Sequence, residues 1–217
     1  VARRAPARPR APMRVVDGQN MIVSTYVELE LAQTAAVSGK MCYSLKLDPA
    51  NLKLTMKEDG TRFKAGTGDT DALEIVNGTA LTCARFAKFR ELYHQYRVNS
   101  CKVEIVTDAG CGLENPVLFC TDKSSIGVVE NTSAFMAQAH KQCILTDTMR
   151  TAQYGWTAKT SQDKEFHMWK NTGMEDQNAY FIKVLQDVEP HADSKCKHRV
   201  TLTFNVTMKD SSNVALN

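Results

Sequence analysis

The stretch HRVTLTFNVTMKD (198–210) decides the fold class, because apolar and polar residues alternate along it without a break. Successive side chains of a β-strand point to opposite faces, so a period of two predicts a strand with one buried and one solvated face. The predicted buried face carries Val200, Leu202, Phe204, Val206 and Met208.

The same texture recurs along most of the chain. MIVSTYVELELAQT (21–34) alternates in its second half, and MCYSLKL (41–47) alternates with Met41, Tyr43, Leu45 and Leu47 on one side. Shorter apolar runs predict further strands, and they are VNSCKVEIVTDAG (98–110), NPVLFCTD (115–122) and AYFIKVLQDV (179–188). NLKLTM (51–56) reads as a short strand, ALEIVNGTALTC (72–83) as a strand or loop edge, and EDGTRFKAGTGDTD (58–71) as a loop.

Two segments interrupt the β texture. ARFAKFRELYHQYR (84–97) has aromatic residues at three- and four-residue steps, which predicts an amphipathic helix. SAFMAQAHK (133–141) predicts a small helix with Thr132 or Ser133 as its N-cap. Many short strands, two brief helices in connections and no βαβ rhythm predict an all-β chain folded as a single jelly-roll β-sandwich.

Length and composition are those of one globular domain. The 217 residues are 43% hydrophobic, which suffices for one core. No run approaches the roughly 18 apolar residues of a membrane span, and no apolar segment follows the basic start as in a secretory signal. We therefore expect a soluble protein with no membrane partner, divided into an arm (1–19), a shell-like domain (20–210) and a short polar tail (211–217).

The positive charge is concentrated at the start of the chain. VARRAPARPRAPMR (1–14) contains no acid and five arginines, which are Arg3, Arg4, Arg8, Arg10 and Arg14. Without them, 22 Lys and Arg face 24 Asp and Glu, so the remaining body carries about −2. Arginine binds phosphate through a bidentate fork, so these five residues are the predicted nucleic-acid site. A solvated terminus or a nuclear-localisation tract is the alternative.

The aromatic residues of 84–97 allow two interpretations. Phe86, Phe89, Tyr93 and Tyr96 share a helical face, so the interpretation we favour is packing against the core or an interface. The alternative is base stacking, as in single-strand binders. Arg85, Lys88 and Arg90 on the opposite side could face the genome or a neighbouring subunit.

No motif for catalysis or for a structural metal stands out. The seven cysteines show no C-x-x-C pair, which favours buried free thiols over a disulfide framework. The five histidines lack metal-site spacing, although one at an interface could titrate during particle disassembly. Asp69, Asp71 and Glu74 could bind Ca²⁺ at a subunit contact, but a solvated loop is the simpler interpretation. Neither a catalytic site nor a cofactor is predicted.

Two segments resemble capsid proteins of circovirus-like single-stranded DNA viruses. FAKFRELYHQYRVNSCKVEI (86–105) is similar to the aromatic stretch that leads into a core strand of that family. The residues that match in kind and order are Phe89, Tyr93, Tyr96, Arg97, Val98, Lys102, Val103 and Glu104. HRVTLTFNVTMKDSS (198–212) resembles the family's last strand and short polar tail. With the basic start, the resemblance covers about a quarter of the chain.

The chain also departs from that family. Circoviral arms are longer and denser in arginine than this one, and residues 40–80 and 110–190 show no residue-level match. Coats of small positive-strand RNA viruses and satellite viruses share the jelly roll and the basic arm, so the genome type stays open.

The resemblance implies a capsid protein that assembles as sixty copies, or a small multiple, around a viral genome. Single-stranded DNA is favoured as the nucleic-acid partner over RNA, and the protein would reside in the virion, with a nuclear stage in the host compatible with the basic arm. The alternative function is a cellular single-stranded nucleic-acid-binding module that stacks bases on its aromatic residues. A β-sandwich enzyme with a dispersed site would be a third possibility.

Overall fold

The computed structural model describes residues 18–32, 39–56, 61–65, 79–81, 83–108, 115–123, 127–129, 131–138, 140–146, 148–158, 168–172, 180–188 and 195–209. The five arginines of the arm, the acidic residues of 69–74 and the tail 211–217 lie outside these ranges. The domain boundaries therefore stay a prediction.

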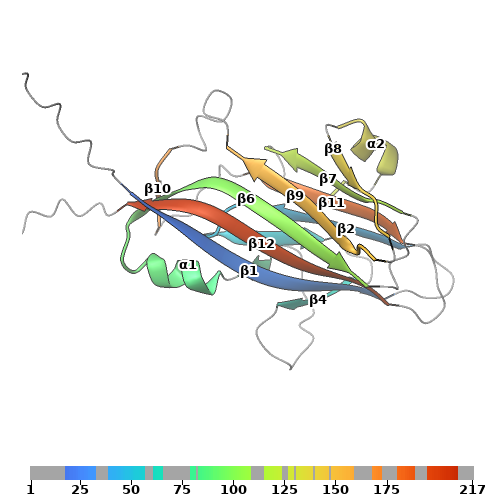
Figure 1. The fold of residues 1–217 in the computed structure, drawn as a ribbon, viewed down its shortest axis with the longest axis horizontal. Helices are drawn as coiled ribbons and strands as arrows, with labels where there is room; N and C mark the ends of the chain where they lie inside the picture. The colour runs from blue at the N-terminus through green and yellow to red at the C-terminus, as the bar shows by residue number, and fades with distance from the viewer. Residues whose placement is uncertain are drawn as a thin grey trace, which may run out of the picture.

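Two antiparallel sheets of six strands face each other (Figure 1). Sheet A has the order β10-β6-β12-β1-β4, with β9 also paired to β6, and sheet B has the order β5-β3-β2-β11-β7-β8. The strands of sheet A are β1 (Gln19–Ala32), β4 (Thr61–Ala65), β6 (Gln95–Thr107), β9 (Thr151–Thr157), β10 (Lys170–Asn171) and β12 (Lys195–Lys209). Those of sheet B are β2 (Gly39–Lys46), β3 (Leu52–Met56), β5 (Thr79–Leu81), β7 (Val117–Asp122), β8 (His140–Cys143) and β11 (Phe181–Val188).

The winding of the chain is that of a jelly roll. Four adjacent strands of sheet A, β1-β12-β6-β9, correspond to four of sheet B, β2-β11-β7-β8. Strands at matching positions in the two rows are neighbours along the chain, as β1 and β2, β11 and β12, β6 and β7, and β8 and β9 are. Two Greek keys wound in this way define the jelly roll, so the predicted fold class is confirmed.

The core fills the space between the sheets and uses the faces that alternation predicts. The five apolar residues predicted for the buried side of β12, from Val200 to Met208, are fully buried. Met41, Tyr43, Leu45 and Leu47 are buried on the side of sheet B that faces them. Period-two patterning therefore specified which face of β12 and of β2 turns inward.

A second, smaller apolar cluster covers the outer face of sheet B. Phe135 of α2 (Thr132–Met136) packs there against Cys42, Leu118, Cys120 and Leu185. Because both faces of sheet B are covered at this point, β11 is buried along nearly its whole length. This explains why AYFIKVLQDV reads as a continuous apolar run and not as an alternating one.

Three local predictions need correction. The helix expected over 84–97 is α1 (Ala84–Phe89), and Tyr96 and Arg97 already belong to β6. The loop expected over 58–71 contains β4, which pairs with β1. The helix expected over 133–141 ends at Met136, and its N-cap is Asn131, whose side chain accepts hydrogen bonds from the backbone N–H groups of residues 133 and 134. Pairing with neighbouring strands overrides local propensity in the first two cases.

The cap of α2 gives a direct test of this arrangement. Asn131→Ala removes an acceptor for two backbone N–H groups and is expected to lower the free energy of unfolding by about 1 kcal/mol, measured by urea denaturation. Ser133→Ala is the control, since Ser133 is exposed, and it should change stability by less than about 0.5 kcal/mol. A larger loss for Ser133→Ala would identify Ser133 as the cap instead.

Candidate nucleic-acid interface

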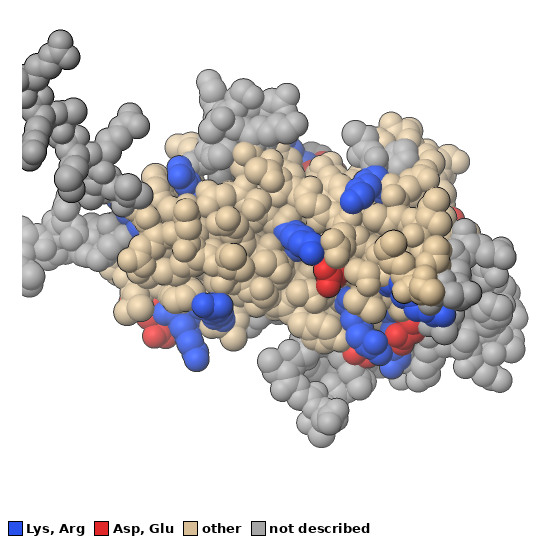
Figure 2. All heavy atoms as spheres, in the orientation of Figure 1, with Lys and Arg blue, Asp and Glu red and all other residues tan. Residues whose placement is uncertain are grey.

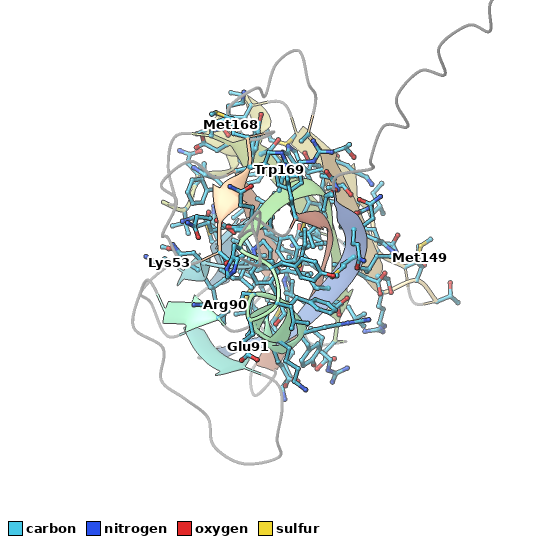
Figure 3. The ribbon with its side chains drawn as sticks, turned by 90° about the vertical axis from the view of Figure 1, so that its left-hand side faces the viewer. Lys53, Arg90, Glu91, Met149, Met168 and Trp169 are labelled. Atoms are coloured by element: carbon cyan, nitrogen blue, oxygen red, sulfur yellow. The ribbon has the colours of Figure 1, made fainter. Side chains whose placement is uncertain are left out.

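The described chain begins at one end of the sandwich, and several elements converge there. β1 and β6 start at this end, β12 ends at it, and α1 and β10 lie beside them (Figure 1). The Tyr93 hydroxyl donates a 2.7 Å hydrogen bond to Oε1 of Gln19, which ties the segment after α1 to the start of β1. We call this region, which Figure 3 shows facing the viewer, the arm end.

A buried ionic contact between the two sheets stabilises the arm end. The Tyr96 hydroxyl donates a 2.7 Å hydrogen bond to Oδ1 of Asp48, and Lys170 Nζ lies 3.8 Å from Oδ2 of the same carboxylate. All three side chains are buried, and Asp48 comes from the segment after β2. The contact therefore joins the two sheets and fixes β10 against β6.

The short strand β10 brings a tryptophan next to two cations. β10 pairs with β6 so that Lys170 lies opposite Tyr96, and Trp169, the residue before β10, lies next to Arg97. The guanidinium carbon of Arg97 is 5.1 Å from the Trp169 ring centroid, and Lys209 Nζ is 5.7 Å from it. We call Arg97, Trp169 and Lys209 the Trp169 cluster, and both cation distances fall in the range of cation–π attraction.

The helix α1 adds further positive charge to the arm end. Arg85, Lys88 and Arg90 are exposed, and the first turn of the helix contains no acid. Glu91 is the acidic residue next to them, and Figure 3 labels it beside Arg90. The opposite side of α1 buries Phe86, so the helix presents its cations to solvent.

Charges at the other end of sheet A neutralise one another instead. Glu28 lies 3.6 Å from Lys197 and 3.7 Å from Arg199, and Arg199 also lies 3.4 Å from Asp108. Figure 2 shows blue and red atoms intermixed at this end. At the arm end, by contrast, Arg85, Lys88 and Arg90 are exposed beside one acidic residue, Glu91.

The aromatic residues of 84–97 pack rather than stack on a ligand. Phe86 and Tyr96 are 1% and 0% exposed, and their rings meet edge to face at a centroid distance of 5.0 Å. Phe89 and Tyr93 are half-buried against the same core. The packing interpretation is confirmed for Phe86 and Tyr96, whose burial leaves no ring face for a base.

A buried histidine forms a second link between the sheets, far from the arm end. The Tyr43 hydroxyl of sheet B lies 3.1 Å from Nδ1 of His198 on β12, and Nε2 lies 2.6 Å from Oε1 of Gln186 on β11. Gln186 in turn donates to the carbonyl of Asn115. Burial lowers the pKa of His198 to about 3 and raises the pKa of Tyr43 well above its usual value. A protonated Tyr43 can donate to Nδ1 of the neutral ring while Nε2–H donates to Gln186.

The cysteines within the described residues are mostly buried free thiols, as expected. Burial raises the pKa of Cys120 to about 11 and also raises the pKa of Cys83 and Cys101. The expectation is wrong for Cys196, which is disulfide-bonded. Spacing in sequence gives no signal for such a contact. Thiols with raised pKa values are poor nucleophiles at neutral pH.

The remaining candidates add no further site. Within the described ranges, no group of three or more His, Cys, Asp or Glu side chains could hold a metal ion. The acidic residues 69, 71 and 74 fall outside those ranges, and their Ca²⁺ role stays a prediction. No described helix is long and apolar enough to span a membrane.

Sequence reasoning missed Trp169, Lys209 and His198. The sequence carried a signal for His198, because period-two alternation puts residue 198 on the same inward face as Val200. It carried none for Trp169, since residues 169 and 97 are far apart in the chain and only the pairing of β10 with β6 joins them. Arg97 was noted only as part of the family resemblance.

Comparison with known proteins gives a fold and not a family. No protein-family model and no curated protein sequence matches the chain. Among solved structures, the semi-empty VLP of giant freshwater prawn Macrobrachium rosenbergii nodavirus is similar at 10% identity, over 97% of this chain and 94% of that one, with a TM-score of 0.53. Cocksfoot mottle virus is similar at 10% identity, over 93% and 100% of the two chains, with a TM-score of 0.51.

These likenesses establish a jelly roll of the type found in viral capsids. The decameric BFDV capsid protein matches at 10% identity over 88% of this chain and 99% of that one, but its TM-score of 0.48 adds nothing to the assignment. The similar structures come from several different viruses, so the fold does not single out the circovirus-like group. That resemblance stays a prediction.

Proposed function

We propose that this chain is the capsid subunit of a small icosahedral virus, that it self-assembles into a closed shell, and that it packages a single-stranded genome through its arginine arm. The role is structural and not enzymatic. The observation that carries the proposal is a jelly-roll sandwich in which exposed cations lie at the end where the described chain begins. An arm with five arginines in its first fourteen residues would extend that positive region.

Exposed apolar side chains support assembly with further copies of the chain. Ile144, Met149 and Met136 are 74%, 58% and 40% exposed; Met136 ends α2, Ile144 follows β8 and Met149 precedes β9. Large apolar side chains gathered at exposed positions favour protein contacts over solvent. In a closed shell, neighbouring subunits would cover such residues.

Electrostatic attraction would link assembly to genome binding. Each arginine that neutralises a phosphate releases counterions, so binding is insensitive to sequence and weakens as salt rises. Among genomes, we favour single-stranded DNA because the resemblance at 86–105 is to that group of viruses. Single-stranded RNA is the other outcome of the test below.

The cellular single-strand-binding module is a weaker candidate. It would need stacking on the aromatic residues of 84–97, and Phe86 and Tyr96 are buried in the core. It also predicts a chain that works as a monomer or dimer, whereas the capsid proposal predicts particles.

The proposal is tested by expressing the full chain and separating it by size-exclusion chromatography, followed by electron microscopy. We expect closed particles whose nucleic acid is protected from nuclease until the shell is opened. DNase and RNase digestion of the extracted nucleic acid then distinguishes the two genome types. A strictly monomeric or dimeric species in all buffers, with no particles, would overturn the proposal.

A further inference from the structure

The Trp169 cluster places two cations against a single aromatic ring. Arg97 and Lys209 lie within 5.1 Å and 5.7 Å of the Trp169 ring centroid, and Trp169 itself is half-buried. Lys209 is paired with Gln95 in the β12–β6 ladder and Arg97 with Thr207, so the two cations come from diagonal positions of neighbouring strands. Like charges at such positions repel, and an anion between them removes the repulsion.

Arg97 has unused donor capacity in this cluster. Its Nε is buried and has no hydrogen-bond partner. A buried N–H group without an acceptor is unfavourable, and a guanidinium is built to donate two parallel hydrogen bonds to a phosphate or carboxylate. The ring of Trp169 limits the motion of the guanidinium, so the donors are oriented before any ligand arrives.

The cluster lies where the arm joins the sandwich. Gly18, the first described residue, has a φ of +140°, and a Cβ at this position would lie 2.6 Å from Cγ2 of Thr207 and 3.4 Å from the Trp169 ring. Only glycine allows the backbone to pass so close in this conformation. A polyanion bound to the arginines of the arm would therefore reach the Trp169 cluster as it passes onto sheet A.

The outer face of sheet A continues from the cluster with uncharged polar groups. Thr207 donates a 2.7 Å hydrogen bond to Asn20 and accepts a 2.8 Å one from Asn99, which leaves amide groups along the surface. Beyond them lies an open pocket of about 270 Å³ with Gly155, Ile22 and Lys102 in its lining. Arg97 and Lys102 are five residues apart on β6, which is about 16 Å at 3.3 Å per residue.

We infer that the Trp169 cluster is a phosphate-binding site for single-stranded nucleic acid, next to the point where the arm joins the sandwich. The bound nucleic acid continues over the outer face of sheet A toward the Gly155 pocket. The inference rests on the proposed function, since it assigns part of genome binding to the folded domain. Phosphates bind between Arg97 and Lys209, and the uncharged groups beyond contact sugars and bases without strong sequence preference.

The first test measures how binding depends on salt. The full chain and its Arg97→Gln/Lys209→Gln variant are titrated with dT20 and with U20 RNA between 50 and 300 mM salt. Two lost phosphate contacts are expected to reduce the slope of log K against log salt by about 1.4, at about 0.7 per contact on a single strand. Lys123→Gln is the matched control, because Lys123 also lies over an aromatic ring, 5.2 Å from the centroid of Tyr180, but at the end of a strand of sheet B.

Tryptophan fluorescence provides the second test, because the chain contains two tryptophans. Trp169 is half-buried within the cluster, whereas Trp156 is 9% exposed and packs against Tyr180. Oligonucleotide binding is expected to quench the emission of the full chain, and Trp169→Phe should abolish most of that quenching. Binding confined to the arm would leave the emission unchanged and overturn the inference.

The two proposals fail separately. If particles form normally but the salt slope of the Arg97→Gln/Lys209→Gln variant equals that of Lys123→Gln, the phosphate site is overturned and the capsid proposal stands. If no particles form but the double variant has a reduced salt slope, the capsid proposal is overturned and the phosphate site stands. Comparison of dT20 with U20 shows which nucleic acid the site prefers.

Discussion

Replacement of Arg3, Arg4, Arg8, Arg10 and Arg14 by glutamine is expected to yield particles that are largely empty of nucleic acid. Five lost phosphate contacts should reduce the slope of log K against log salt by about 3.5 on a single strand. Between 50 and 200 mM salt, the native chain should therefore lose about a hundredfold more affinity than the variant does. The nucleic-acid content of purified particles is read from their absorbance at 260 and 280 nm, and the slope from oligonucleotide titrations.

The control replaces the same five arginines by lysine, which keeps the charge and removes the bidentate fork. This variant should keep most of the native slope, because counterion release depends on charge and not on guanidinium geometry. Unchanged nucleic-acid content in the glutamine variant would show that the arm is not the packaging element. The folded domain, with the Trp169 cluster, would then be the main contact.

Acidification from pH 7 to pH 5 is expected to destabilise the folded chain through His198. The pKa of His198 is about 3 in the folded state, below the value of about 6.5 in an unfolded chain. The stability from the neutral, buried ring is therefore fully present above about pH 6.5 and is lost as the pH falls toward 3. Each pH unit in this window lowers the free energy of unfolding by about 1.4 kcal/mol, so the loss at pH 5 is about 2 kcal/mol.

Urea denaturation at pH 7 and at pH 5 measures this loss. His198→Gln should lower stability at pH 7 and remove about 2 kcal/mol of the pH dependence, since glutamine does not titrate. Tyr43→Phe is the control: it removes the hydroxyl that contacts Nδ1 but keeps the histidine, so it should lower stability while retaining the pH dependence. Equal pH dependence in the native chain and in His198→Gln would contradict the role of His198.

The alternating apolar and polar residues predicted the sandwich, because burial of one face of a strand requires an apolar residue at every second position. The predicted inward residues of β12 and β2 are buried in the core. Alternation is absent from β11, which is covered on both sides and was predicted as a strand from its continuous apolar run instead. The short edge strand β4 was missed, because its sequence between two glycines reads as a loop. Helix length was overestimated at 84–97, because Phe86 and Tyr96 meet through packing between α1 and β6 and not along one helix.

The candidate site, too, was predicted only in part from the sequence. The sequence alone determined an all-β chain with a strongly basic start, since composition and period-two patterning act locally. Only the tertiary structure decided that Arg97, Trp169 and Lys209 meet beside Gly18, and that His198, Tyr43 and Gln186 join the two sheets. Each of these groups combines residues from strands that pair or face each other across long stretches of chain. Such contacts depend on register and sheet order, which no local pattern of residues encodes.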